Sequence, residues 1–100
     1  MIGYYTKFTT NAESRERLAA FLSEAATSIK SIPECKLYEV SLDASDFTIT
    51  VVAEVWADEA AHDVSLQTEE TKKIIAQAMP LLTAPPEQIK FGSVITSWFN

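Results

Sequence analysis

One hundred residues, of which 47% are hydrophobic and 22% charged, suit a single folded domain (residues 1–100), and two glycines and four prolines argue against disorder. The net charge of −6 and the scattering of the eight cations argue against binding to nucleic acid or to an anionic membrane, which need clustered Lys and Arg. The chain has no run of about 18 apolar residues, and its first residues lack a signal-peptide pattern, so we expect a cytoplasmic protein.

The first third of the chain predicts a strand followed by a helix. Alternating residues from 2 to 9 predict the strand. Thr10, with Glu13 three residues later, has the form of a capping box, which predicts that the helix starts there. Pro33 ends the helical region, which carries an apolar stripe of Leu18, Phe21, Leu22, Ala25, Ile29 and Ile32.

Two further strands are predicted to form a hairpin. Residues 35–43 alternate again, and the polar residues 44–46 predict a short loop before the strand at residues 47–56. One face of this third strand is wholly apolar, with Phe47, Ile49, Val51, Ala53 and Val55. The other face is mixed, with Thr48, Thr50, Val52, Glu54 and Trp56. Such a strand should be covered on both faces.

The last part of the chain predicts helices and a final strand. Asp58 and Thr68 are each expected to cap a helix. The second of these helices has an apolar stripe and should end near Met79, because Pro80 follows. After the loop LLTAPPE, residues 88–98 predict a strand with a bulge at Gly92.

The predicted order β-α-β-β-α-β indicates an α+β, ferredoxin-like fold with an antiparallel sheet. The helices of such a fold cover one face of the sheet, so the apolar face of the third strand must be buried elsewhere. A second copy of the chain is the simplest cover. We therefore expect a homodimer joined through its sheet faces.

Two segments resemble the antibiotic biosynthesis monooxygenase (ABM) family of the dimeric α/β-barrel group: CKLYEVSLD (35–43) and FTITVVAEVWADEAAHDVSLQTEETKKIIAQAMPLLTAPPE (47–87). The resemblance lies in the Cys that opens the second strand, in YEV, in the E-x-W that closes the third strand, and in the acidic, Ala-rich helix after it. The ending AMPLLTAPPE is similar to a subgroup named quinol monooxygenases. The family also contains anthrone oxygenases, haem degraders and members without assigned chemistry.

The resemblance implies a homodimer in which each subunit holds a pocket between its own helices and sheet. The family's oxygenases typically use no cofactor, since an electron-rich phenol or quinol loses a proton and reacts with O₂ directly. Such chemistry needs a dry pocket, a group that takes the proton, and donors that stabilise an oxyanion. One His and one Cys argue against a metal centre, and two glycines offer no phosphate-binding loop.

Trp56 matches the family's strand-three tryptophan, which lines the pocket of the haem-degrading branch together with an Asn and a His. These partners fall near Lys7 and at Ile75 in this sequence, so haem degradation is not expected. Trp56 is therefore a candidate for substrate binding. The alternative is a core aromatic residue at the end of a strand.

His62 is a catalytic candidate, because histidine titrates near neutral pH and could deprotonate a phenol. Many family members instead carry a His where this chain has Ser65, and a second one where it has Glu70. Ser65 is therefore a further candidate for substrate binding. The alternative for His62 is a first-turn helix residue, partly exposed beside Asp63.

Glu54 shares a strand face with Trp56, and burial against helices would raise its pKa and make it a catalytic base. Its alternative role is to pair with a cation or a backbone amide. Tyr38 is a substrate-binding candidate that could donate to a bound oxyanion, or else a core residue. Cys35 is expected to be a buried structural thiol, and Trp98 and Phe99 to pack at the dimer interface or a sheet edge.

Two functions remain open at this point. The first is a cofactor-free monooxygenase of a small aromatic compound or quinol, an oxidoreductase that uses O₂. The second is a non-catalytic dimeric module that binds a small apolar ligand or serves in a stress response.

Overall fold

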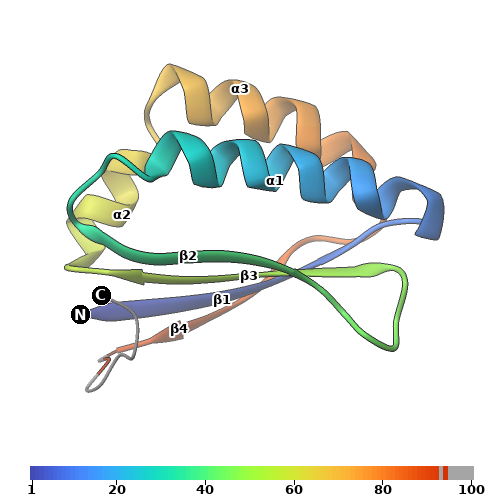
Figure 1. Cartoon of the computed structure of the whole chain (residues 1–100), viewed down its shortest axis with the longest axis horizontal. Helices are drawn as coiled ribbons and strands as arrows, with labels where there is room; N and C mark the ends of the chain where they lie inside the picture. The colour runs from blue at the N-terminus through green and yellow to red at the C-terminus, as the bar shows by residue number, and fades with distance from the viewer. Residues whose placement is uncertain (93, 95–100) are drawn as a thin grey trace.

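The structure, a computed structural model, describes residues 1–92 and residue 94 and has two layers (Figure 1). One layer is a four-stranded antiparallel sheet with the strand order β2-β3-β1-β4, and the other layer consists of helices on one face of this sheet. The elements are β1 (Ile2–Thr9), η1 (Ala12–Ser14), α1 (Arg15–Ile29), β2 (Cys35–Leu42), β3 (Ile49–Trp56), α2 (Glu59–Ser65), α3 (Glu69–Ala78), η2 (Met79–Leu81) and β4 (Glu87–Phe91). The predicted α+β, ferredoxin-like arrangement is confirmed.

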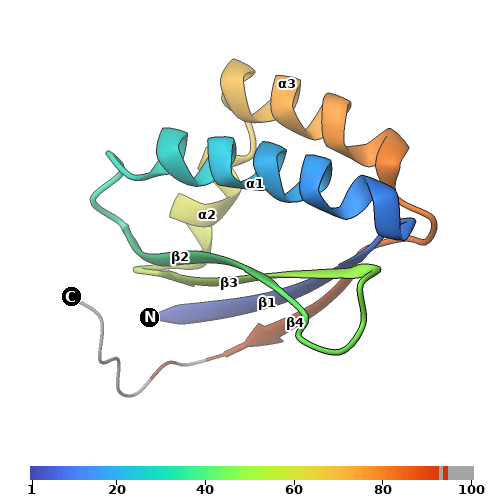
Figure 2. The ribbon, with the colours of Figure 1, turned by 45° about the vertical axis from the view of Figure 1, so that its right-hand side comes forward.

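The helical layer buries one face of the sheet. Helix α1 contacts β2 and β3, and α3 packs on α1 (Figure 2). Leu18 and Leu22 of α1 form a core cluster with Phe8, Val52 and Ala78. A second cluster joins Ile2, Tyr4, Ile29 and Trp56. None of the helices in the described part of the chain is long and apolar enough to cross a membrane.

Both predicted caps in the second half of the chain are confirmed. The Asp58 carboxylate accepts a hydrogen bond of 2.8 Å from the Ala61 N–H and starts α2. The Thr68 hydroxyl accepts one of 3.2 Å from the Thr71 N–H and starts α3. The carboxylate cap fixes the start of α2, and so determines which of its residues face the sheet.

The capping box predicted at Thr10 is wrong. The helical region begins with η1, and α1 starts only at Arg15. Thr10 is buried and still belongs to the sheet layer, since its N–H donates to the Thr48 carbonyl oxygen. Its hydroxyl donates to the Asn11 carbonyl oxygen and does not cap the helix.

The third strand is shorter than expected, because it begins at Ile49 and not at Phe47. Asp43 accepts hydrogen bonds from the backbone N–H groups of Ser45 and Asp46, and Asp46 accepts them from Thr48. These side-chain bonds extend the hairpin loop. Phe47 therefore lies outside the strand, 64% exposed, with the Arg15 guanidinium 5.3 Å from its ring centre.

The final strand also differs from the expectation. β4 ends at Phe91, and Gly92 forms a bend after the strand and not a bulge within it. The remaining part of the predicted strand, and with it Trp98 and Phe99, lies outside the described residues apart from Val94.

The second face of the sheet has no helix of the described chain over it (Figure 2). Tyr5, Ile89 and Phe91 are 42%, 57% and 48% exposed there, beside the half-buried side chains of Val51, Ala53 and Val55. The apolar face of β3 thus points away from the helices, as the alternation indicated. That a second chain covers this face stays a prediction.

Candidate functional site

A cavity of about 390 Å³ lies between the helices and the sheet. This volume is within the range of small-molecule sites. The walls are mainly apolar and include Phe8, Leu22, Val52, Ile74 and Ala78. Polar side chains also reach the cavity, among them Thr6, Tyr38, Glu54, His62, Ser65 and Gln88. Four of the five predicted site residues therefore line one cavity.

The strand register brings Glu54 into this cavity. Glu54 lies opposite Tyr4 on β1 and Tyr38 on β2, on the face that α1 covers. Its side chain is only 10% exposed, and Oε1 accepts a hydrogen bond of 3.1 Å from Nε1 of Trp56. Burial raises the pKa of Glu54, while the Trp56 hydrogen bond and a charge on His62 act in the opposite direction. The cavity thus holds a carboxyl group that retains its proton to higher pH than usual.

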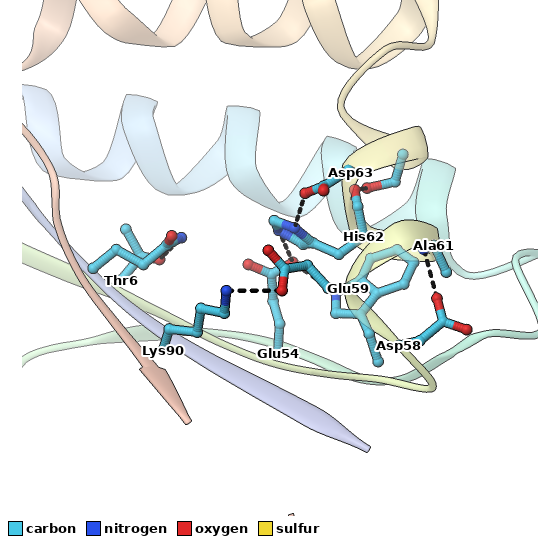
Figure 3. A network of polar contacts seen from close by, with 11 residues as sticks. Thr6, Glu54, Asp58, Glu59, Ala61, His62, Asp63 and Lys90 are labelled. Carbon is cyan, nitrogen blue, oxygen red and sulfur yellow. Dashed lines mark hydrogen bonds and ion pairs between the residues drawn. The ribbon is translucent and has the colours of Figure 1, made fainter. Parts of the chain in front are cut away.

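His62 is buried, so the alternative that it is a partly exposed residue of the first helical turn is wrong (Figure 3). Helix α2 lies over one end of β1 and β3, and the imidazole stacks on the Tyr4 ring with 3.9 Å between centroids. The indole of Trp56 meets it edge-on at 5.7 Å. Nε2 lies 3.9 Å from Oε1 of Glu54, and Nδ1 lies 3.4 Å from Oδ1 of Asp63. The imidazole therefore lies between a buried carboxyl group and a largely exposed one.

The model of the antibiotic biosynthesis monooxygenase family matches residues 1–77. The chain belongs to this family. A Chloroflexus aurantiacus protein, provisionally described as an antibiotic biosynthesis monooxygenase, is 28% identical, with a TM-score of 0.87 over 99% of this chain and 98% of that one. Rv0793 from Mycobacterium tuberculosis is 21% identical, with a TM-score of 0.85 over 96% and 97% of the two chains. A comparison with curated protein sequences found no match.

The family's strand-three tryptophan, Trp56, is fully buried but is not one of the residues that line the cavity. It lies behind Glu54 and donates a hydrogen bond to it. Lys7, near the position of the haem-degrading branch's Asn, pairs with Glu87 at 3.5 Å, on the sheet face opposite the cavity. Ile75 is an apolar lining residue. In this ABM chain, therefore, the tryptophan holds the carboxyl group of Glu54.

Tyr38 and Ser65 both line the cavity as predicted site residues. Burial raises the pKa of Tyr38 above its ordinary value, so its hydroxyl keeps its proton and can act as a donor. The Ser65 hydroxyl donates to the carbonyl oxygen of His62 at 2.6 Å. Its oxygen is left to accept a hydrogen bond from a ligand. Cys35 is half-buried outside this cavity, and burial raises its pKa to about 11.

Tyr4, Thr6 and Gln88 also belong to the site, although no sequence motif marks them as site residues. Tyr4 is buried beneath His62, and burial raises its pKa. Nε2 of Gln88 donates a hydrogen bond of 3.0 Å to Oγ1 of Thr6, its partner across β1 and β4. The alternation of residues 2–9 did place Tyr4 and Thr6 on one face. No sequence pattern marked Gln88, because its position in the site depends on the register between β1 and β4. Gln88 also lies after residues 1–77, which the family model matches.

Proposed function

We propose that this chain is a cofactor-free monooxygenase that oxidises a small electron-rich phenol or quinol with O₂. Membership of the ABM family supports oxygenation. The observation that carries the proposal is the buried carboxyl group of Glu54, of raised pKa, in a mainly apolar cavity. A carboxylate with a raised pKa is a stronger base than usual, and a desolvated cavity strengthens its interactions with a ligand.

In the proposed reaction, Glu54 takes the hydroxyl proton of the ligand. The resulting phenolate is electron-rich enough to give electrons to O₂ directly, so no external reductant is required. Over one turnover the ligand loses two hydrogens and gains one oxygen atom, and the second oxygen atom leaves as water. A ring carbon bonds to O₂ to form a peroxide, whose outer oxygen takes the proton back from Glu54. As the O–O bond breaks, the hydrogen of that carbon leaves as a proton and joins the departing hydroxide to give water, so Glu54 acts first as base and then as acid.

The neighbours of Glu54 suit these two roles. Trp56 holds one carboxyl oxygen and thereby fixes the orientation of the group. His62, when protonated, stabilises the carboxylate form of Glu54 through its charge. Tyr38 lies beside Glu54 on the neighbouring strand and offers a hydroxyl donor to the developing oxyanion.

We also propose that the active form is a homodimer joined through the open sheet face. Tyr5, Ile89 and Phe91 expose large apolar side chains on one continuous surface there. Such a surface is costly to leave in water, and a self-complementary twofold contact is the commonest way to bury it.

Oxygen uptake with anaerobically prepared anthrone and 1,4-dihydroxynaphthalene, in the presence of a chelator, tests the proposed reaction. Glu54→Gln should lower turnover about 100-fold or more. Glu24→Gln is the matched control, because Glu24 is exposed on α1 and lies outside the cavity lining. If the wild-type protein binds these compounds but consumes no O₂, the chain is a non-catalytic binding module and the proposal is wrong.

A further inference from the structure

We infer that Thr6 and Gln88 form a second anchoring point in the cavity, which binds a neutral oxygen at the far end of a ligand whose hydroxyl group is held by Glu54. The inference rests on the proposed function only for the ligand's chemistry, an aromatic hydroxyl compound. It assigns to this site a preference for ligands with oxygens at both ends.

The Thr6–Gln88 pair is oriented into the cavity. Both residues line it, and they face each other across neighbouring strands. Thr6 is 5% exposed, whereas Gln88 lies on the edge strand at the solvent side of the cavity. The Gln88 amide donates to the Thr6 hydroxyl oxygen at 3.0 Å. This bond leaves the Thr6 hydroxyl hydrogen, the second amide hydrogen and the amide oxygen of Gln88 to meet a ligand.

The spacing of the two anchoring points fits one aromatic ring. Thr6 lies opposite Val52 on β3, and Glu54 lies two residues further along that strand on the same face. The Cα atoms of such diagonal neighbours are roughly 7–8 Å apart. Figure 3 shows the side chains of Thr6 and Glu54 on the same side of the sheet, the side of the helices. A six-membered ring with oxygens on opposite carbons, lying over the Val52 side chain, would present one oxygen to Glu54 and the other to the Thr6–Gln88 pair.

The charges around the cavity indicate what that second oxygen is. The described residues that line the cavity include one carboxyl group, Glu54, and no Lys or Arg. Lys90, on β4, is paired with Glu59 at 2.8 Å and lies outside the lining. His62, the remaining lining residue that can carry a positive charge, faces Glu54 at 3.9 Å. A carboxylate or phosphate at the Thr6–Gln88 end would therefore meet no cation among the described lining residues. The amide and hydroxyl suit a phenolic hydroxyl or a ring carbonyl.

Binding of two ligands under anaerobic conditions, measured by calorimetry on the whole chain, tests this inference. 1,4-Dihydroxynaphthalene has both oxygens, whereas 1-naphthol has one. Thr6→Val and Gln88→Leu should each weaken binding of the first ligand roughly fivefold to tenfold, the effect of one lost hydrogen bond, and leave binding of 1-naphthol unchanged. Thr27→Val and Gln77→Leu are the matched controls, because Thr27 lies exposed on α1 and Gln77 lies exposed on α3, both outside the lining of this cavity.

Equal losses for the two ligands, or no loss for either, would overturn the second anchoring point. So would a wild-type protein that binds neither ligand. Thermal unfolding of each variant shows whether it is folded, and only folded variants are compared. The readout needs no turnover, so a protein that discriminates between the ligands but consumes no O₂ supports this inference while refuting the proposed reaction.

Discussion

The indole Nε1 of Trp56 donates a hydrogen bond of 3.1 Å to Oε1 of Glu54, two residues earlier on the same face of β3. The bond joins the tryptophan by which the chain resembles its family to Glu54, the one carboxyl group among the described residues that line the cavity. The bond stabilises the charged form of Glu54 and lowers its pKa, whereas burial raises this pKa. Trp56 therefore influences the site without lining the cavity.

Replacement of Trp56 by Phe should raise the pKa of Glu54 further, because the variant loses the hydrogen bond that lowers it and keeps an aromatic ring. A base acts in its deprotonated form, so the acidic limb of the rate profile should move to higher pH. Carbon-13 NMR of the Glu54 carboxyl group measures the pKa directly. An unchanged titration in Trp56→Phe would show that the hydrogen bond has no electrostatic role.

The raised pKa of Glu54 also predicts how stability depends on pH. The folded state binds the Glu54 proton more tightly than the unfolded state, so the free energy of unfolding falls as pH rises from about 4.5 through the folded pKa. Each unit of pKa difference corresponds to about 1.4 kcal/mol. Glu54→Gln should remove this loss, so that its stability relative to wild type increases with pH in urea titrations. Glu24→Gln, at an exposed position on α1, should show no such trend, and a flat difference for Glu54→Gln would contradict the prediction.

Tyr4 should determine the orientation of the His62 ring through stacking. Tyr4→Phe keeps the ring, and we expect nearly wild-type stability and oxygen uptake. Tyr4→Leu removes the stack, which is worth about 0.5–1.5 kcal/mol, so the His62 ring loses its fixed orientation. The folded fraction of this variant should therefore take up less oxygen per molecule than folded Tyr4→Phe. Equal oxygen uptake by the two folded variants would rule out a positioning role for Tyr4.

Thr50 offers a test of the core. Its hydroxyl oxygen is buried and has no hydrogen-bond partner among the described residues. Thr50→Val removes this buried polar group at nearly constant volume and should stabilise the protein by about 1 kcal/mol. Thr10→Val should destabilise it, since the equally buried Thr10 hydroxyl donates a 2.9 Å bond to the Asn11 carbonyl oxygen. Opposite shifts in thermal unfolding are expected, and a lower midpoint for Thr50→Val would refute the argument.

The open sheet face predicts the oligomeric state. Light scattering at micromolar concentration should give the mass of a dimer, and Ile89→Lys should give a monomer, because it places a charge among the exposed apolar side chains of this face. Val64→Lys is the matched control, since Val64 is 67% exposed on α2, on the helical side of the sheet. A monomeric wild-type protein would exclude the proposed dimer.

The sequence by itself determined the order of the elements and the face of each strand, because both follow from local periodicity. The alternation in residues 49–56 placed Glu54 and Trp56 together, and Asp58 and Thr68 started the helices they were expected to start. The local patterns gave wrong predictions at Thr10, for the start of the helix, and at Phe47, for the start of the strand. Backbone and side-chain hydrogen bonds outside the regular elements override the pattern there.

The tertiary structure alone decided how the site is assembled. His62 is buried because α2 lies across the end of β1 and β3, a placement that no spacing within the helix encodes. Thr6 and Gln88 meet because the register of β1 and β4 pairs residues 82 positions apart. Local patterns fix which way a side chain points from its own element, whereas contacts between elements depend on how the whole chain packs.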